Sequence, residues 1–513
     1  MPLLAGCETL NTPLPEPDQL EPRTAPATRP PTTVIEVSEE VSEVIADEPA
    51  PPPVDLLDRI RDGFALPDSE AHADRIAPHL RWYASHPQYL DRVFARASRY
   101  VYFIVEQLDE REMPLEFALL PIVESAYDPF AYSHGRAAGL WQIIPGTGKR
   151  LGLKQDWWYD GRRDVVAATG AALDYLEAMH ERFDDDWLLT TAAYNSGPGR
   201  VGRSRNGSLT GFWELKLPAE TRNYVPKLLA LKMLVSDPER YGVTLPVIAN
   251  DPVFASVDTG GQLDLATAAD LADTDLDTLY LLNPGFNRWA TDPDGPHQLL
   301  VPFDKAELFA ESLAALPPED RLRWVRYRIR PGDSLILIAR KHNTTVEVVR
   351  QINGIRGSMI RAGDHLMIPV ASKSLDEYAL SAGVRLQRTQ NTPRGANRTS
   401  HVVERGDSLW KIASSFDVDA GRLAKWNGMA PGDTLRVGQE LVVWTEGARG
   451  SGPPQTRRKI HYTVRRGDSL ARISSKFNVT VTQLRAWNAK ARGKYIQPGQ
   501  KLVVYVDVRQ QGG

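Results

Sequence analysis

Apolar side chains recur at helical spacing between residues 55 and 247. Side chains three or four positions apart lie on the same face of a helix. Five apolar positions with this spacing are Leu90, Val93, Phe94, Ala97 and Val101. The stretch 164–179, DVVAATGAALDYLEAM, predicts a second and strongly apolar helix. We therefore expect residues 55–247 to form one mainly α-helical domain.

Three copies of one unit follow Leu322. Each copy opens and closes with a short strand and has two short helical patterns between them, which predicts a β-α-α-β module. Each copy contains the tripeptide Gly-Asp-Ser, which begins at Gly332, Gly406 and Gly467. An asparagine stands 21 positions after each glycine, at Asn353, Asn427 and Asn488.

Both helices of these modules have predicted start signals. The Gly-Asp pair predicts a strand-to-helix turn in which the aspartate, such as Asp333, caps the first helix. Two capping boxes, Thr344 with Glu347 and Thr480 with Gln483, predict the start of the second helix.

A fainter fourth copy precedes these three at 252–320. Its helical stretch LATAADLADTDLDTLYLLNPG leads to an apolar strand at 298–301, but the Gly-Asp-Ser turn is missing. We expect the module's fold here rather than its binding function. The linkers 371–400 and 446–458 contain Gly, Pro, Ser and Arg, a composition typical of flexible joints.

The first 54 residues have the composition of a tether. Pro, Glu, Thr and Ala dominate after Thr9, which predicts an extended, disordered segment over 1–54. Cys7 is the only cysteine, so neither an intramolecular disulfide nor a paired-cysteine zinc site can form. The run Leu-Ala-Gly-Cys that ends at Cys7 resembles a bacterial lipobox, which implies lipidation of Cys7. Residues 1–6 lack the charged and apolar regions of a signal peptide, so lipidation requires a start site farther upstream. The alternative is that Cys7 is an ordinary residue of the tether.

Composition places the chain among multidomain proteins. With 513 residues, 42% of them hydrophobic, it is long enough for several buried cores. A formal net charge of −4 gives no general reason to expect nucleic acid. The basic stretches 321–330 and 456–466 are either solvated surface or a face for an anionic polymer. No phosphate-binding loop or zinc motif occurs, so we expect no cofactor and no metal.

Glu124 stands out because it lies in the apolar stretch 119–143, LLPIVESAYDPFAYSHGRAAGLWQI. A buried carboxylate is costly unless it is paired, hydrogen-bonded or protonated. At its ordinary pKa of about 4.3, a glutamate holds a proton in about one molecule in five hundred at pH 7. Apolar surroundings that raise the pKa to about 6 increase this to about one in ten, which suits a general acid.

Three further segments bring polar and aromatic groups that are typical of a binding site: 139–143, 193–199 and 220–225. Each has an ordinary alternative, since a tryptophan is often core and Asn-Ser-Gly-Pro-Gly is often only a turn. A glycosidase usually needs a second carboxylate. The nearest one in sequence is Asp128, but Pro129 follows it, which is more typical of a turn or a cap.

The order ES, GLWQI, AYNSG and ETxxYV closely resembles the lysozyme-like domain of lytic transglycosylases over about 110–230. The resemblance implies that Glu124 is the catalytic acid and base. It also implies roles for five neighbours: Ser125 and Asn195 near the reacting centre, Gln142 on the glycan, and Tyr194 and Tyr224 lining the site. The repeats at 326–370, 401–445 and 460–506 resemble LysM domains, which bind glycans that contain N-acetylglucosamine.

These resemblances imply a mainly α lysozyme-like catalytic domain followed by small LysM domains. The implied activity is cleavage of the bond between N-acetylmuramic acid and N-acetylglucosamine in peptidoglycan, with a 1,6-anhydromuramoyl product. We expect peptidoglycan strands as the partner and a periplasmic location in a Gram-negative bacterium. If Cys7 is lipidated, the outer membrane is favoured, because Glu8 follows it rather than an aspartate that would retain the protein at the inner membrane. The alternatives are a hydrolytic muramidase or chitinase, and a wall-binding scaffold with an inactive enzyme domain.

Overall fold

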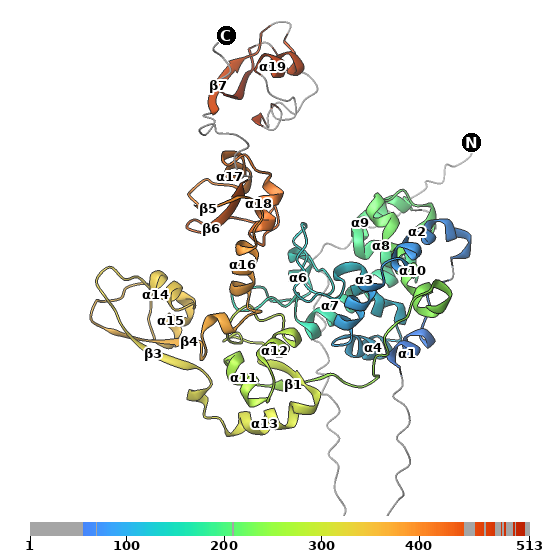
Figure 1. Cartoon of the computed structure of the whole chain (residues 1–513), viewed down its shortest axis with the longest axis horizontal. Coiled ribbons are helices and arrows are strands. Elements are labelled where there is room, and N and C mark those ends of the chain that lie inside the picture. The colour runs from blue at the N-terminus through green and yellow to red at the C-terminus, as the bar shows by residue number, and fades with distance from the viewer. Residues whose placement is uncertain are drawn as a thin grey trace, which may run out of the picture. The chain divides into compact units, whose positions relative to one another are not determined.

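The computed structural model describes residues 55–67, 69–207, 210–445, 457–465, 468–477, 484, 487–488, 496–497 and 499–507. The expected tether 1–54, with Cys7, lies outside these residues, and so do Thr480 and Gln483. Figure 1 shows the order of the elements along the chain.

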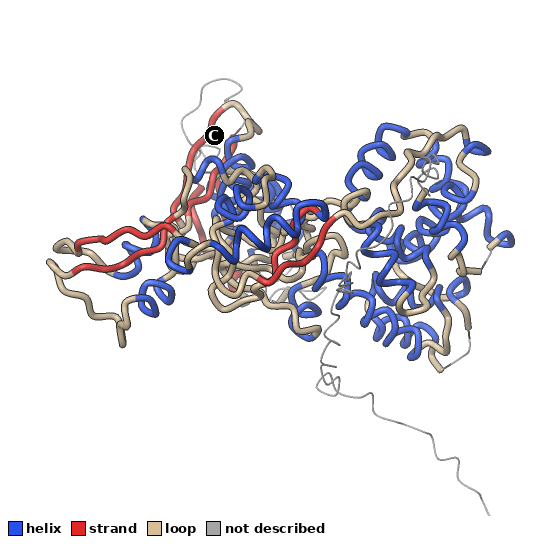
Figure 2. The backbone as a smooth tube through the Cα atoms, turned by 90° about the horizontal axis from the view of Figure 1, so that it is seen from below, coloured by secondary structure: helices blue, strands red, loops and turns tan. Residues whose placement is uncertain are grey.

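The first part of the chain is helical, as the apolar spacing predicts, and Figure 2 shows its helices gathered in one body. Its α-helices are α1 (Leu56–Asp62), α2 (Ala73–Ala84), α3 (Pro87–Ala97), α4 (Val101–Asp109), α5 (Leu120–Ser125), α6 (Pro145–Arg150), α7 (Val165–Arg182), α8 (Trp187–Ser196), α9 (Pro198–Arg205) and α10 (Ala219–Ser236). A 3-10 helix over Leu115–Leu119 leads directly into α5.

The predicted apolar face is buried, although it is divided between α3 and α4. Leu90, Val93, Phe94 and Ala97 belong to α3, and Val101 begins α4. Helix α7 covers the second predicted stretch and begins after Asp164, whose side chain accepts a hydrogen bond from the Ala167 N–H. Helix α10 packs against α2 and α8, and α7 packs against α8. These packed helices form the scaffold on which the site is built.

The second part of the chain consists of small modules, each with a two-stranded sheet. The first has β1 (Phe254–Asp258), α11 (Leu265–Leu271), α12 (Leu276–Leu282), β2 (Gln298–Pro302) and an added α13 (Ala306–Ala315). The next two have β3 (Arg323–Arg328), α14 (Leu335–Lys341), α15 (Val346–Ile352) and β4 (His365–Val370), then β5 (Asn397–Val402), α17 (Leu409–Ser415), α18 (Ala420–Trp426) and β6 (Glu440–Thr445). The last has β7 (Arg457–Thr463), α19 (Leu470–Lys476) and β8 (Lys501–Asp507). The predicted fold class, a helical domain followed by β-α-α-β modules, is confirmed.

The repeated asparagine explains the constant spacing of the modules. Asn353 ends α15, and its Nδ2 donates to the carbonyls of Val349 and Met367, both at 2.8 Å. Its Oδ1 accepts from the Met367 N–H at 2.8 Å, so one amide joins the second helix to the closing strand. The same three hydrogen bonds are made by Asn427, Asn488 and Asn283. Asn283 therefore identifies the 252–320 region as a true fourth copy of the fold.

The predicted helix caps are wrong by one residue. Ser334, not Asp333, caps α14, because its extended backbone lets its hydroxyl accept from the Leu337 N–H. The Asp333 carboxylate instead closes the preceding turn by accepting from the Arg330 N–H at 2.7 Å. Likewise Thr345, not Thr344, caps α15.

The first linker is not the flexible joint that its composition predicts. Residues 382–391 form the helix α16 (Ala382–Asn391), and Tyr378 before it is fully buried. The Tyr378 hydroxyl donates to the buried Asp264 carboxylate at 3.0 Å, and the Ser372 hydroxyl donates to it at 2.9 Å. Buried residues such as Tyr378 anchor this segment to the module that contains β1 and β2. We call it the fourth module, because it is the fourth and faintest copy of the unit, although it comes first along the chain. The second linker lies mostly outside the described residues.

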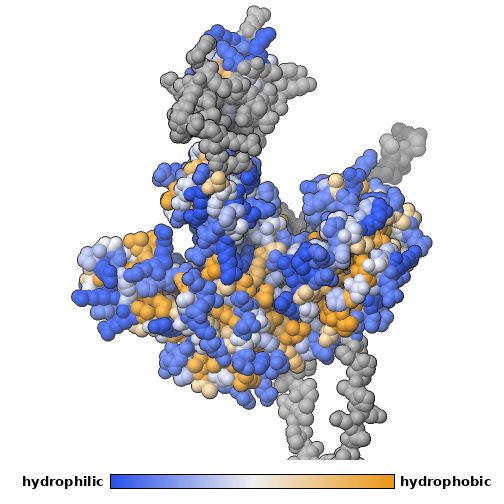
Figure 3. Space-filling view, viewed as in Figure 1, coloured by the Kyte–Doolittle hydropathy of each residue, from blue (hydrophilic) through white to orange (hydrophobic). Residues whose placement is uncertain are grey.

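The fourth module shares a core with the segment Trp157–Arg163, which we call the support segment. Trp158 and Tyr159 pack in one buried cluster with Phe286 and Trp289 of the module. Hydrophilic residues dominate the face that Figure 3 shows, and hydrophobic residues occur there in separate small groups. Among the described helices, none has both the length and the apolar character needed to traverse a bilayer.

Candidate active site

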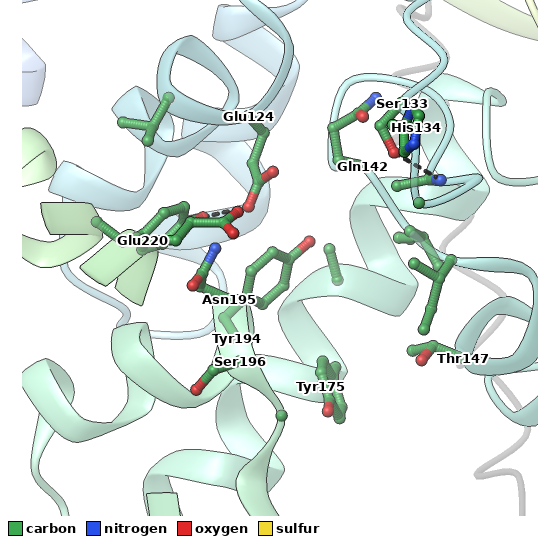
Figure 4. A pocket seen from close by; sticks show the side chains of 18 of the residues that line it. Glu124, Ser133, His134, Gln142, Thr147, Tyr175, Tyr194, Asn195, Ser196 and Glu220 are labelled. Carbon is green, nitrogen blue, oxygen red and sulfur yellow. Dashed lines mark hydrogen bonds between the residues drawn. The ribbon is translucent and has the colours of Figure 1, made fainter. Parts of the chain in front are cut away.

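A cavity of about 690 Å³ opens in the helical domain, and most of the predicted site residues line it. These lining residues are Glu124, Gln142, Tyr194, Asn195 and Tyr224. Figure 4 shows Glu124, Glu220 and Asn195 on one side of the cavity and Gln142, Ser133 and His134 on the facing side. The structure therefore brings together four segments that are far apart in the sequence.

Glu124 is carried by α5, a helix of only six residues. Pro121 stands in its first turn, where a missing N–H costs nothing, and Ala126 ends it in the left-handed conformation at φ 52°. Leu120 and Ile122 point into the core of the domain. Glu124 lies one residue before the end of the helix and faces the cavity.

The carboxyl group of Glu124 has one hydrogen-bond donor among the described residues, the hydroxyl of Tyr224. Burial raises the pKa of Glu124 to about 7, against the lowering effect of the Tyr224 hydrogen bond. The negative charge of Glu220 raises this pKa further, and Lys227 lowers it. A carboxyl with a pKa of about 7 is protonated in about half of the molecules at pH 7.

Tyr224 stays protonated and donates its hydrogen bond to Glu124 as a neutral hydroxyl. Burial raises the pKa of Tyr224 well above its ordinary value, and the neighbouring Glu124 carboxylate acts in the same direction. The hydroxyl is thus a donor over the whole physiological range, and it is aimed at one oxygen of Glu124.

Two predicted site residues hold the backbone of the stretch Gly139–Ile143. The Ser125 hydroxyl oxygen lies 2.9 Å from the Leu140 carbonyl and 3.1 Å from that of Pro121. The Tyr194 hydroxyl donates to the Trp141 carbonyl at 2.7 Å. Ser125 does not line the cavity, whereas Tyr194 does. Both hydroxyls join α5 and α8 to this stretch.

Gln142 occupies a strained position in the same stretch. Its φ of 48° is left-handed, and its Nε2 donates to the Gly139 carbonyl at 2.9 Å. Gly139 has a φ of 79°, and a Cβ there would lie 2.1 Å from the Arg162 carbonyl oxygen. Only glycine fits at position 139, and this close approach sets the turn that presents Gln142 to the cavity.

Asn195 and Tyr224 are linked through α10. The Asn195 Oδ1 accepts from the Thr221 hydroxyl at 2.8 Å, and Thr221 lies one turn of the helix before Tyr224. This hydrogen bond fixes the orientation of the Asn195 amide. The Asn195 Nδ2 has no hydrogen-bond partner among the described residues, so it is available to a ligand in the cavity.

Two charged residues line the cavity besides Glu124: Glu220, which sequence reasoning included in the segment 220–225 without a role of its own, and Lys227, which it missed. Their signal was present, because they stand four positions before and three after Tyr224, on one face of α10. Asp128, the carboxylate considered first, does not line the cavity. Its Oδ1 accepts from the Phe130 N–H at 2.9 Å, as expected of a turn former. Within the described residues, no group of three or more His, Cys, Asp or Glu side chains could hold a metal ion.

Family models match most of the folded chain. The model of the Transglycosylase SLT domain matches residues 101–210, and that of the lytic transglycosylase MltD LysM-like domain matches 253–318. The LysM domain model matches 327–369, 401–444 and 462–504. The matches include every segment that lines the cavity except α10.

Individual relatives agree with these matches. Membrane-bound lytic murein transglycosylase D of Escherichia coli strain K12 is 38% identical over 383 residues, which cover 71% of this chain and 81% of the relative. An autolysin of Enterococcus faecalis is 34% identical over 187 residues, 35% of this chain and 24% of that one. A solved structure, an inactive mutant of the lytic transglycosylase Slt from Pseudomonas aeruginosa, is 26% identical over 28% of this chain and 25% of that chain. The TM-score of the two structures is 0.23.

Proposed function

Because this chain belongs to the family of membrane-bound lytic murein transglycosylase D, and is a lytic transglycosylase with peptidoglycan-binding LysM domains, we propose that Glu124 performs both of its proton transfers. The observation that carries the proposal is a partly buried carboxyl with a pKa of about 7 that faces a cavity and has Tyr224 as its hydrogen-bond donor.

In the first step, protonated Glu124 donates its proton to the oxygen between N-acetylmuramic acid and N-acetylglucosamine. The bond from the muramoyl C1 to this oxygen breaks, and the N-acetylglucosamine side leaves as an alcohol. The acetamido group of the substrate assists at C1. Glu124 is left ionised, and the Tyr224 hydroxyl stabilises the new charge by its hydrogen bond.

In the second step, ionised Glu124 accepts the proton of the muramoyl C6 hydroxyl. The C6 oxygen then bonds to C1 and closes a 1,6-anhydro ring. An intramolecular nucleophile of this kind acts at high effective molarity. Glu124 ends the cycle protonated, so no water and no second base are consumed. Coupled with wall binding by the modules, this reaction serves cell-wall remodelling as well as turnover.

The other predicted residues position the glycan in this proposal. The amide groups of Gln142 and Asn195 bind sugar hydroxyls from opposite sides of the cavity, and Tyr194 contributes to its wall. A direct contact of Ser125 with the sugar stays a prediction. Its hydroxyl lies within hydrogen-bond distance of the Leu140 carbonyl, so an indirect role through this stretch is also open to test.

A hydrolytic muramidase is the second candidate, and Glu220 is the observation that favours it. Glu220 lines the same cavity, and its negative charge raises the pKa of Glu124. A hydrolase needs such a carboxylate to activate water. Glu220 is exposed to solvent, however, and its side chain has no hydrogen-bond partner among the described residues that would hold it over the cavity.

Mass analysis of the products from purified sacculi separates the two candidates. The transglycosylase reaction gives muropeptides one water lighter than hydrolysis products, which resist borohydride reduction at the muramoyl end and contain no oxygen-18 from labelled water. Reducible, oxygen-18-labelled ends as the main product would return the chain to the muramidases.

We also propose that the modules and a lipid at Cys7 hold the enzyme at the wall from the outer membrane. Tethered modules raise the effective concentration for the next contact. Deleting 326–513 should therefore reduce activity on insoluble sacculi far more than on short soluble fragments. Detergent-phase partitioning tests the anchor, which would be contradicted if partitioning persisted in Cys7→Ala.

A further inference from the structure

A buried ion pair lies behind the cavity in the support segment. Arg162 and Asp160 are 6% and 7% exposed, so neither is a surface charge. The Arg162 Nε and Nη2 donate to the two carboxylate oxygens of Asp160 at 2.8 and 2.7 Å. This bidentate arrangement fixes the plane of the guanidinium.

The remaining nitrogen of Arg162 holds the stretch Ala131–Ile143, which we call the pocket loop. Nη1 donates to the Arg136 carbonyl at 2.8 Å and lies 3.3 Å from the Ile143 carbonyl. These two carbonyls stand before and after Gln142 in the loop. Ala138 and Ile143 are also joined by backbone hydrogen bonds in both directions. Arg162 thus fixes both sides of the turn that presents Gln142.

The support segment is itself held from its other side. The Asp160 N–H donates to the Gly285 carbonyl at 2.8 Å, and the Asn287 N–H donates to the Trp158 carbonyl at 2.7 Å. Gly285 and Asn287 belong to the fourth module. The contacts therefore run from this module through Asp160 and Arg162 to the pocket loop.

We propose that Arg162 is a positioning residue for glycan binding. It sets the place of Gln142 by holding the pocket loop, and Asp160 joins this loop to the fourth module. On this view the fourth module, which lacks the Gly-Asp-Ser turn, supports the active site instead of binding glycan. Arginine is required because its planar fork serves a carboxylate and two carbonyls at once, which a lysine ammonium cannot. The inference rests on the proposed role of Gln142.

The first test is Arg162→Lys in the full chain, with Arg111→Lys as the matched control. Arg111 also pairs with a carboxylate, Asp174, at 3.0 Å, but on the surface and outside the cavity. We expect Arg162→Lys to raise KM about tenfold and to change kcat less than about twofold, because the misplaced loop weakens binding. The control should change neither. An unchanged KM for Arg162→Lys would overturn the inference.

A second measurement does not depend on activity. Trypsin cleaves after Arg136, and the carbonyl of that peptide bond is the one that Arg162 holds. Limited digestion followed by mass spectrometry should show faster cleavage after Arg136 in Arg162→Lys than in the control. Equal rates would contradict the role of Arg162. The double variant Asp160→Asn with Arg162→Met avoids an unpaired buried carboxylate, and it should show the same change if Arg162→Lys fails to fold.

Glycan binding measured in a Glu124→Gln background separates this inference from the proposed mechanism. Isothermal titration with a tetrasaccharide of alternating N-acetylglucosamine and N-acetylmuramic acid should give weaker binding when Arg162→Lys is added. If Glu124→Gln stays active, the proposed mechanism is wrong. The comparison of dissociation constants with and without Arg162→Lys still tests the role of Arg162. Equal dissociation constants would overturn the positioning role alone.

Discussion

Glu116 and Glu124 lie on one continuous segment, Leu115–Ser125, and their surroundings differ sharply. Glu116 is fully buried, and its carboxylate accepts from the Ala65 N–H at 3.0 Å and the Leu66 N–H at 2.8 Å. Lys232 adds an opposite charge 3.4 Å away. Glu124 has only the Tyr224 hydroxyl as a donor among the described residues.

The two carboxylates differ in how many groups compensate them for lost water. Three donors compensate Glu116 for the water that it loses, so its charge can tie the start of the domain to α10. Glu124 is compensated by one donor, and burial therefore raises its pKa to about 7. Glu116 is therefore a structural carboxylate with several partners, whereas Glu124 is a candidate acid with one donor.

The largest expected effect is that of Glu124→Gln on turnover. The substitution removes the exchangeable proton and little volume, so kcat should fall by about a thousandfold or more while the circular dichroism spectrum is unchanged. Turnover on soluble glycan fragments is the measurement. Activity within tenfold of the parent, in a folded variant, would assign the acid role to another residue, and Glu220 would be tested next.

Glu116→Gln should have the opposite effects: it should lower the stability of the fold and leave turnover nearly unchanged. It leaves the Lys232 ammonium without its carboxylate and weakens two backbone hydrogen bonds, which should reduce the free energy of unfolding by about 3 kcal/mol. The kcat per folded molecule should stay within about twofold. Urea unfolding of the full chain measures the first effect. A stable variant that had lost its turnover would show that Glu116 acts in catalysis, and the comparison would fail.

Glu124 should also make the stability of the protein depend on pH. The folded-state pKa of Glu124 is raised from 4.5 to about 7, so the folded state binds the proton more tightly than the unfolded state. The stability that this group contributes is fully present below about pH 4.5 and is lost as the pH rises through about 7, by about 3 kcal/mol. Glu124→Gln should remove this loss, so it should stabilise the protein at pH 8 and not at pH 4. If parent and variant had the same free energy of unfolding at pH 8 as well as at pH 4, the raised pKa would be contradicted.

The sequence predicts the modules and the burial of Glu124, but it does not predict contacts between residues that only the fold brings together. Constant spacing around Asn353 predicts the modules because one short-range amide contact defines their fold. The apolar neighbours of Glu124 predict burial, and its catalytic role stays a prediction. The role of Arg162 was not predicted, because the two backbone carbonyls that it holds come near it only in the folded chain. The packing of Tyr378 against Asp264 was missed for the same reason.

The smallest expected effect concerns the single donor of Glu124. Tyr224→Phe removes the hydroxyl that lowers the pKa of Glu124, so this pKa should rise above about 7. The limb of the kcat/KM profile that falls as the acid loses its proton should therefore move to higher pH. At pH 7 we expect kcat to fall about fivefold to tenfold, because a hydrogen bond to a charged group is worth about 1.5 to 3 kcal/mol and only part of it is lost between the two steps. Tyr175→Phe is the matched control, because Tyr175 lines the same cavity and makes no hydrogen bond to Glu124 among the described residues. A pH profile that moved equally in both variants, or that moved to lower pH in Tyr224→Phe, would mean that Tyr224 does not set the acidity of Glu124.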